Sequence, residues 1–235
     1  MFILNEIISK STQRQKKLQI KLLGDSITHG VGGTGFCQDG EPIVEGFARN
    51  PNGFCWAKLF KEYLEQNYKC SVINNACTGT NIEFIIENFQ TLVESSDDIV
   101  ICTIGTNNRH QYKNERQKKS REEFAKTFYN NILLLNEKFK QSQKPVIFMA
   151  NIPASKENEQ DGADYWRILH MDDINAIYKK ASLEKGFSFI SLYDMFSNYI
   201  KENTLSLDCL LKDGLHPNDK GYTVMFELLK VALKI

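Results

Sequence analysis

The stretch DIVICTIG at residues 98–105 is an almost continuous apolar run of strand length. Such a strand is buried on both faces, as in a parallel sheet that helices cover on each side. Similar short runs lie before and after it, and longer helical patterns separate them. The stretch therefore predicts an α/β protein built on a parallel sheet.

The alternation extends along the rest of the chain. We expect strands at 18–24, 70–76, 98–105, 145–153 and 187–195. We expect helices at 56–68, 82–96, 122–141, 166–184, 195–202 and from 219 onward. This order predicts a five-stranded parallel sheet in a three-layer α/β/α sandwich with right-handed crossovers. Functional groups in such folds collect at the carboxyl ends of the strands.

Length and composition narrow the class of protein. The chain has 235 residues, of which 42% are hydrophobic, so we expect one domain over 18–235 preceded by an N-terminal extension over 1–17. Its 29 basic and 29 acidic residues cancel, which argues against a protein built around nucleic-acid phosphates or an anionic membrane. No apolar run approaches the ~20 residues of a membrane span. The N-terminus does not resemble a secretory signal, so a cytoplasmic location is predicted.

Two further patterns bear on metals and nucleotides. The six cysteines form no CxxC pair, so we expect core cysteines and no metal site. The segment GVGGTG at 30–35 matches GxGxxG, which leaves a nucleotide-binding protein as one hypothesis. That motif should open a helix directly after a strand, whereas this one begins six residues past Gly24 and continues into a loop-like segment.

Four polar segments follow predicted strands or precede the last helix. They read GDSITHG at 24–30, NNACTGTN at 74–81, GTNN at 105–108 and DGLHPND at 213–219. The first places a serine on a strand-to-helix turn that can expose its hydroxyl. Serine is a poor nucleophile unless a base lies beside it, and the last segment contains a histidine.

These four segments resemble, in order and spacing, the four signature blocks of the SGNH hydrolase superfamily, also called GDSL esterases and lipases. The resemblance runs from about residue 18 to the end of the chain. It implies a flavodoxin-like α/β/α fold and an enzyme that hydrolyses esters through a serine nucleophile. It implies no metal and no organic cofactor.

The resemblance also assigns roles to residues. Ser26 would be the nucleophile, His216 the general base and Asp213 the partner that orients the histidine. The oxyanion of the tetrahedral intermediate would be bound by the backbone N–H groups of Ser26 and Gly79 and by the side-chain amide of Asn107.

The blocks depart from the family pattern at two positions. Asn108 stands where the third block usually has an aspartate, and Ala76 stands where the second block often has a glycine. Asn108 and His110, beside the third block, are predicted to contact substrate. His29, three residues after Ser26, is expected to lie in the cleft wall or at the surface.

The sequence therefore predicts a serine esterase that acts on a small-molecule acyl ester. Polar loops with aromatic residues favour removal of a small acyl group, acetyl above all, from a carbohydrate or similar alcohol. Lysophospholipid or thioester hydrolysis, acyl transfer to another alcohol, and a non-catalytic ligand-binding module remain as alternatives.

Overall fold

The computed structural model describes residues 4, 8, 17–36, 53–115 and 117–235. Most of the predicted extension at 1–17 lies outside the described residues, and so do Cys37 and the centre of the loop at 31–55. Leu4 and Ile8, within the extension, are buried in the hydrophobic core.

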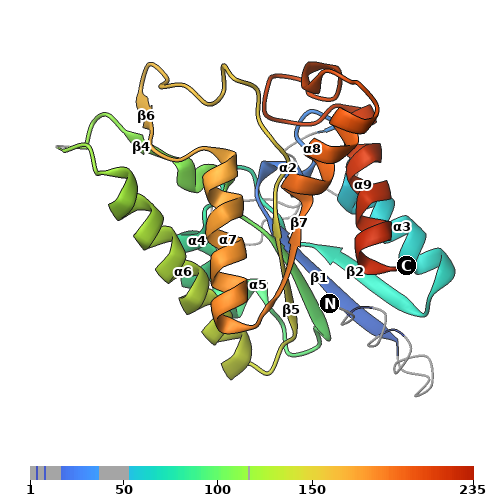
Figure 1. Cartoon of the computed structure of the whole chain (residues 1–235). Coiled ribbons are helices and arrows are strands. Elements are labelled where there is room, and N and C mark those ends of the chain that lie inside the picture. Colours follow the sequence, from blue (N-terminus) through green and yellow to red (C-terminus); the bar gives the residue numbers. More distant parts are fainter. Residues whose placement is uncertain (1–3, 5–7, 9–16, 37–52, 116) are drawn as a thin grey trace.

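A parallel sheet forms the centre of the molecule (Figure 1). Its strands, in spatial order, are β2 (Cys70–Asn74), β1 (Leu18–Gly24), β3 (Ile99–Thr103), β5 (Val146–Ala150) and β7 (Ser188–Ser191). Every neighbouring pair in this sheet is parallel. The order and direction confirm the predicted five-stranded, flavodoxin-like fold class.

Helices cover both faces of the sheet (Figure 1). On one face lie α3 (Trp56–Asn67), α8 (Leu192–Glu202) and α9 (Asp219–Leu233). On the other lie α4 (Ile82–Glu87), α5 (Phe89–Leu92), α6 (Arg121–Gln141) and α7 (Met171–Lys185). Alternate residues of the strands point to opposite layers, so Ile101 packs in the first core and Cys102 in the second. All the described cysteines except Cys209 are buried.

The helix predicted over 82–96 is broken. The side chain and backbone amides of Asn88 both donate to the carbonyl of Phe84, which ends α4 there and lets α5 begin in a new direction. Asparagine side chains compete in this way with the regular helical hydrogen bonds.

Two other boundaries differ from the prediction. The strand expected over 187–195 ends at Ser191, whose hydroxyl accepts from the backbone N–H of Asp194 and so caps α8. The helix expected from 166 begins at Met171, because Tyr165–Arg167 form β6 and pair antiparallel with β4 (His110–Tyr112). Sequence periodicity missed this ribbon because its two strands are short and distant in sequence.

Short helices follow β1 and β3 at the carboxyl ends of these strands. They are α2 (Ser26–His29) after β1 and the 3₁₀ turn η1 (Thr106–Arg109) after β3, and a further 3₁₀ turn, η2 (Leu207–Cys209), precedes the last loop. Within the described part of the chain, no helix has the length and apolar character needed to cross a membrane.

Candidate active site

Ser26 is the first residue of α2, at the carboxyl end of β1, and its side chain is almost fully buried. The chain turns tightly here, because a Cβ at Gly24 would lie 2.5 Å from the Thr28 hydroxyl oxygen and 2.8 Å from the Thr103 carbonyl. Asp25 caps the short helix by accepting from the backbone N–H of Ile27 at 3.0 Å. The first helical N–H groups, including that of Ser26, have no partner inside the helix.

The side chains of Ser26, His216 and Asp213 lie in line. His216 Nε2 is 2.8 Å from Ser26 Oγ, and His216 Nδ1 is 2.8 Å from Asp213 Oδ2. If Nδ1 carries the proton, it donates to the carboxylate and leaves Nε2 free to accept the serine proton. The three residues singled out in the sequence as nucleophile, base and orienting acid are therefore in hydrogen-bond contact.

Hydrogen bonds within the loop stabilise the conformation of the segment that carries Asp213 and His216. Asp213 Oδ1 accepts from the backbone N–H groups of His216 at 2.8 Å and Leu215 at 3.1 Å. Gly214, between them, has a φ of +83°. Burial raises the pKa of the Asp213 carboxyl, but the hydrogen bonds from His216 and Leu215 outweigh it, so the pKa lies below its usual value. The carboxylate therefore stays ionised at neutral pH.

The glycine-rich segment at 30–35 packs against that loop and forms hydrogen bonds with it. A Cβ at Gly32 would lie 2.5 Å from the Pro217 carbonyl and 3.1 Å from His216 Cβ. Thr34 donates from both its backbone N–H and its hydroxyl to the carboxylate of Asp219 at 2.7 Å. The segment consists of turns and does not open a helix, so close packing explains its glycine at 32 without a nucleotide.

Gly79 follows β2 and Asn107 lies in η1 after β3, the two strands that neighbour β1 in the sheet. Gly79 has a φ of +81°, a Cβ there would meet only open space, and its N–H donates to no other described residue. One N–H of the Asn107 amide donates to the Thr80 carbonyl at 2.8 Å, and the amide has a second N–H. Both groups therefore have a donor available for an anionic oxygen.

His29 supports the turn that carries Gly79. The backbone N–H of Thr78 donates to His29 Nδ1 at 3.2 Å, so Nδ1 is unprotonated and the ring proton resides on Nε2. The residue is buried rather than exposed, and burial lowers its pKa below the usual value. A neutral ring is the form that can accept from Thr78.

A buried polar network connects the serine turn to η1. Asn151, at the end of β5, donates to Asp25 Oδ2 at 2.9 Å and to the Thr106 hydroxyl at 2.6 Å. Complete burial raises the pKa of Asp25, although hydrogen bonds from Thr106 and Ile27 and the charges of His216 and Arg109 oppose the shift. Sequence analysis did not single out Asn151, although its place at a strand end was a usable signal.

Arg109 is a second buried residue that sequence analysis missed. Its guanidinium donates to the Thr106 carbonyl at 2.9 Å and to Glu159 at 2.8 Å. Burial lowers its pKa to about 10 against the opposing charge of Glu159, so it remains a cation at neutral pH. The segment containing Glu159 also reaches the His216 loop, because the Ser155 N–H donates to the Gly214 carbonyl at 2.7 Å.

Both the nitrogen and the oxygen of the Asn108 side-chain amide form hydrogen bonds within the protein. Its nitrogen donates to Glu83 Oε2 at 2.6 Å, and its oxygen accepts from the Ile82 N–H at 3.0 Å. An aspartate here would place two carboxylates in contact, which is unfavourable unless one takes a proton. The neighbouring Glu83 thus accounts for the departure from the family pattern, and a substrate contact by Asn108 stays a prediction.

His110 begins β4 and is half-buried between two tyrosines. Its ring centroid lies 5.2 Å from those of Tyr112 and Tyr165. Burial, followed by the charges of Arg167 and Arg109, lowers its pKa to about 4. The imidazole is therefore neutral at neutral pH, and it lines a pocket that also contains Asn107.

One group of potential metal ligands occurs in the described part of the chain. His170, Asp172 and Asp173, at the start of α7, have donor atoms within 4.8 Å of one another. The Asp173 carboxylate already accepts from the Arg121 guanidinium and from the His170 N–H. These contacts give the carboxylate a structural role in capping the helix.

Several solved structures share the fold over nearly the whole chain. The acetylxylan esterase Axe2 from Geobacillus stearothermophilus superposes with a TM-score of 0.67 at 19% identity, covering 93% of this chain and 94% of that chain. LAE5, an α/β hydrolase enzyme from the metagenome of Lake Arreo in Spain, gives a TM-score of 0.66 at 19% identity, with coverages of 92% and 95%. No curated protein sequence matches the chain significantly.

Identities this low show the fold alone, and the sequence itself supplies the family. The profile of the GDSL-like Lipase/Acylhydrolase family matches residues 22–224. That range contains Ser26, Gly79, Asn107, Asp213 and His216. The match spans most of the chain, and the chain therefore belongs to the GDSL-like lipase/acylhydrolase family of ester hydrolases.

Proposed function

We propose that this ester hydrolase removes a small acyl group, acetyl above all, from a carbohydrate or similar polar alcohol through an acyl-serine intermediate. The observation that carries the proposal is the 2.8 Å contact between Ser26 Oγ and His216 Nε2, with Asp213 on the other ring nitrogen at the same distance. The proposal needs no metal and no organic cofactor.

The first half of the reaction forms the acyl-enzyme. Ser26 Oγ attacks the ester carbonyl carbon while His216 Nε2 accepts the hydroxyl proton. The N–H groups of Ser26 and Gly79 and the amide of Asn107 donate to the carbonyl oxygen as it becomes negative. The C–O bond to the alcohol then breaks, and the imidazolium of His216 returns the proton to the departing oxygen.

The second half restores the enzyme. A water molecule attacks the acyl-serine carbonyl, and His216 accepts one of its protons. The same three donors stabilise the second oxyanion, and the acid leaves as Ser26 regains its proton from the imidazolium. Asp213, ionised at neutral pH, stabilises the imidazolium in both halves.

Two observations support the small acyl group and the polar alcohol. The pocket beside Asn107 is lined mostly by polar side chains, which suits a hydroxylated group better than a long alkyl chain. The structural neighbour Axe2 is an acetylxylan esterase, and its catalytic mutants replace a serine, an aspartate and a histidine by alanine. In that enzyme the aspartate and histidine are three positions apart, as Asp213 and His216 are here.

Release of p-nitrophenol from acetate, butyrate and octanoate esters tests the proposal. We expect turnover that is fastest for acetate and that disappears in Ser26→Ala while the melting temperature stays almost unchanged. Ser71→Ala, on the edge strand β2, is the matched control and should behave like the wild type. Equal turnover by wild type and Ser26→Ala would overturn the serine mechanism. Faster turnover of octanoate than of acetate would replace the small acyl group by a lipid-type chain.

A further inference from the structure

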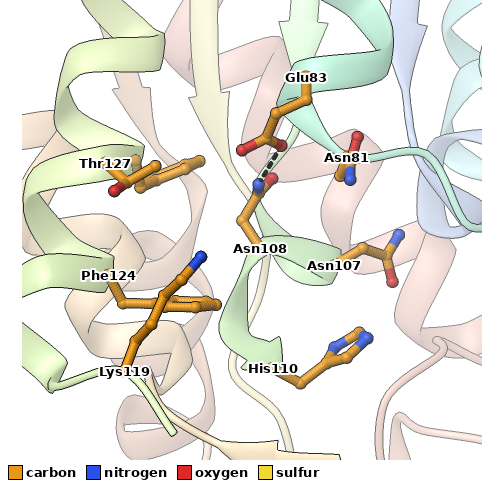
Figure 2. A pocket seen from close by; sticks show the side chains of 9 residues that line it. Asn81, Glu83, Asn107, Asn108, His110, Lys119, Phe124 and Thr127 are labelled. Atoms are coloured by element: carbon orange, nitrogen blue, oxygen red, sulfur yellow. Dashed lines mark hydrogen bonds between the residues drawn. The ribbon is translucent and has the colours of Figure 1, made fainter. Parts of the chain in front are cut away.

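A pocket of about 140 Å³ lies beside Asn107, between α4, η1, β4 and the first turns of α6 (Figure 2). It is smaller than the several hundred Å³ of a site that encloses a whole drug-sized ligand, so it suits one part of a substrate. Asn107 forms part of its wall, which places the pocket next to a donor proposed for the oxyanion.

One side of the pocket is fixed by contacts within the protein. Glu83 accepts from the Asn108 amide at 2.6 Å and from the Asn131 amide at 2.7 Å, so each carboxylate oxygen already has a donor. Figure 2 shows the Glu83–Asn108 hydrogen bond at this side. These groups give the pocket its shape and leave the recognition of a ligand to other residues.

Several other lining groups have hydrogen-bonding capacity that no described residue uses. The Lys119 backbone is held by its N–H donating to Gln111 at 2.9 Å, but the Lys119 ammonium forms no ion pair with a described residue. Asn81 uses its side-chain oxygen to cap α4, which leaves its NH₂ group as a donor. The neutral imidazole of His110 supplies one donor and one acceptor.

An aromatic ring completes this set. The Lys119 side chain extends alongside Phe124, with its ammonium 5.9 Å from the ring centroid, and points toward the side of the pocket formed by Glu83 and Asn108 (Figure 2). Donors and acceptors around an aromatic ring match a sugar, whose hydroxyls both donate and accept and whose C–H face packs on aromatic carbon. An alkyl chain would leave these polar groups unpaired.

We propose that this pocket binds the alcohol part of the substrate as a single hydroxylated sugar ring, with the Lys119 ammonium as its charged hydrogen-bond donor. This inference rests on the proposed function, since the ester must then lie between the pocket and Ser26. Lys119 acts in binding and does not touch the reacting atoms.

The test compares Lys119→Met with Lys118→Met. Methionine keeps the apolar part of the lysine side chain and removes the ammonium. Lys118 is the control, because it is the neighbouring residue and is also exposed but does not line the pocket. Its ammonium lies 5.7 Å from the Trp166 ring centroid and 3.9 Å from the Asp161 carboxylate at the surface. For each variant, kcat/KM is measured with mono-acetylated methyl xyloside and with p-nitrophenyl acetate, and the ratio of the two is taken.

We expect Lys119→Met to lower this ratio about ten-fold, mainly through KM for the sugar ester, because a hydrogen bond from a charged donor is lost. Lys118→Met should keep the wild-type ratio. An unchanged ratio in Lys119→Met, in a protein that hydrolyses p-nitrophenyl acetate, would overturn the pocket assignment and leave the proposed function intact. A gain of activity toward p-nitrophenyl octanoate in Lys119→Met would instead make the pocket an acyl site, which also overturns it.

A binding measurement separates the two proposals further. Methyl xyloside, which carries no ester, is titrated against Ser26→Ala and against Ser26→Ala combined with Lys119→Met. A Kd about ten-fold weaker in the double variant supports the pocket even if ester hydrolysis fails. Equal Kd values in the two proteins, or no binding of the sugar to either, would contradict it.

Discussion

The two sides of Ser26 are held in place by different kinds of contact. In the His216 loop, residues 212–219, the reactive residues are held by hydrogen bonds within the loop, such as those from the N–H groups of His216 and Leu215 to Asp213, while Thr34 and Ser155 contact other positions of the loop. The η1 turn, residues 106–109, depends on buried side chains whose partners are far away in the chain. Arg109 pairs with Glu159, 50 residues later, and Asn151 joins Thr106 to Asp25, 126 residues earlier.

The residues proposed to react and the residues that hold them in place are therefore distributed differently in the two regions. In the His216 loop, the groups that shape the loop are also the groups proposed to react, so a substitution there should affect rate more than folding. Around η1, the buried polar contacts support the turn that carries Asn107 and connect it to the serine turn, so substitutions should divide between loss of rate and loss of stability. The following variants test that division, beginning with the largest expected effect.

His216→Ala should lower kcat for p-nitrophenyl acetate by about 10⁵-fold or more, and Asp213→Asn by about 10⁴-fold, because the members of such a triad act as a unit. Circular dichroism should show melting temperatures close to that of the wild type for both. His170→Gln, which changes a histidine at the start of α7, is the control. Turnover near the wild-type level in His216→Ala would exclude His216 as the base.

Asn107→Ala should lower kcat by about 10²- to 10³-fold, the usual cost of one oxyanion donor. It should also reduce the free energy of unfolding by about 1 kcal/mol, because the hydrogen bond to the Thr80 carbonyl is lost. Steady-state kinetics and urea unfolding measure the two effects, with the exposed Asn130→Ala as control. A variant that loses stability but retains its rate would make Asn107 a purely structural residue.

Arg109→Met should reduce the free energy of unfolding by about 3 kcal/mol, since it removes one partner of a largely buried ion pair. Arg121→Met breaks a more exposed pair with Asp173 and should cost less than about 1 kcal/mol. Urea unfolding of both variants gives the comparison. Equal losses would show that burial of the Arg109 contacts does not support η1.

The lowered pKa of His110 should make the stability of the protein depend on pH. Its pKa is about 4 in the folded chain and near 6.5 when unfolded, so between these values the unfolded state binds the extra proton. Stability therefore falls as the pH falls from 6.5 toward 4. His110→Phe keeps an aromatic ring against Tyr112 and Tyr165 and cannot titrate, so its melting temperature should fall less over this range. Parallel curves for the two proteins would contradict the lowered pKa.

The same contrast explains what could be predicted from the sequence. The strands could be located because their apolar runs are local signals. The segment DGLHPND could be identified because it resembles a family block, although Thr34 and Ser155, which contact it, are far away in the chain. The pairing of Ser26 with His216, 190 residues away, came only from resemblance to a family. The place of Asn151 at a strand end was a local signal, but its partner was not. The role of Arg109 and the pairing of β4 with β6 likewise depend on distant partners, which no local pattern encodes.

The proposed role of Ser26 as nucleophile is tested by labelling the chain with a fluorophosphonate and locating the adduct by peptide mass spectrometry. The reagent phosphonylates a serine whose hydroxyl is activated by a neighbouring base. We expect one adduct, on Ser26, that is absent from His216→Ala treated under the same conditions. An adduct on a different serine, or no adduct on the folded wild-type chain, would contradict this role.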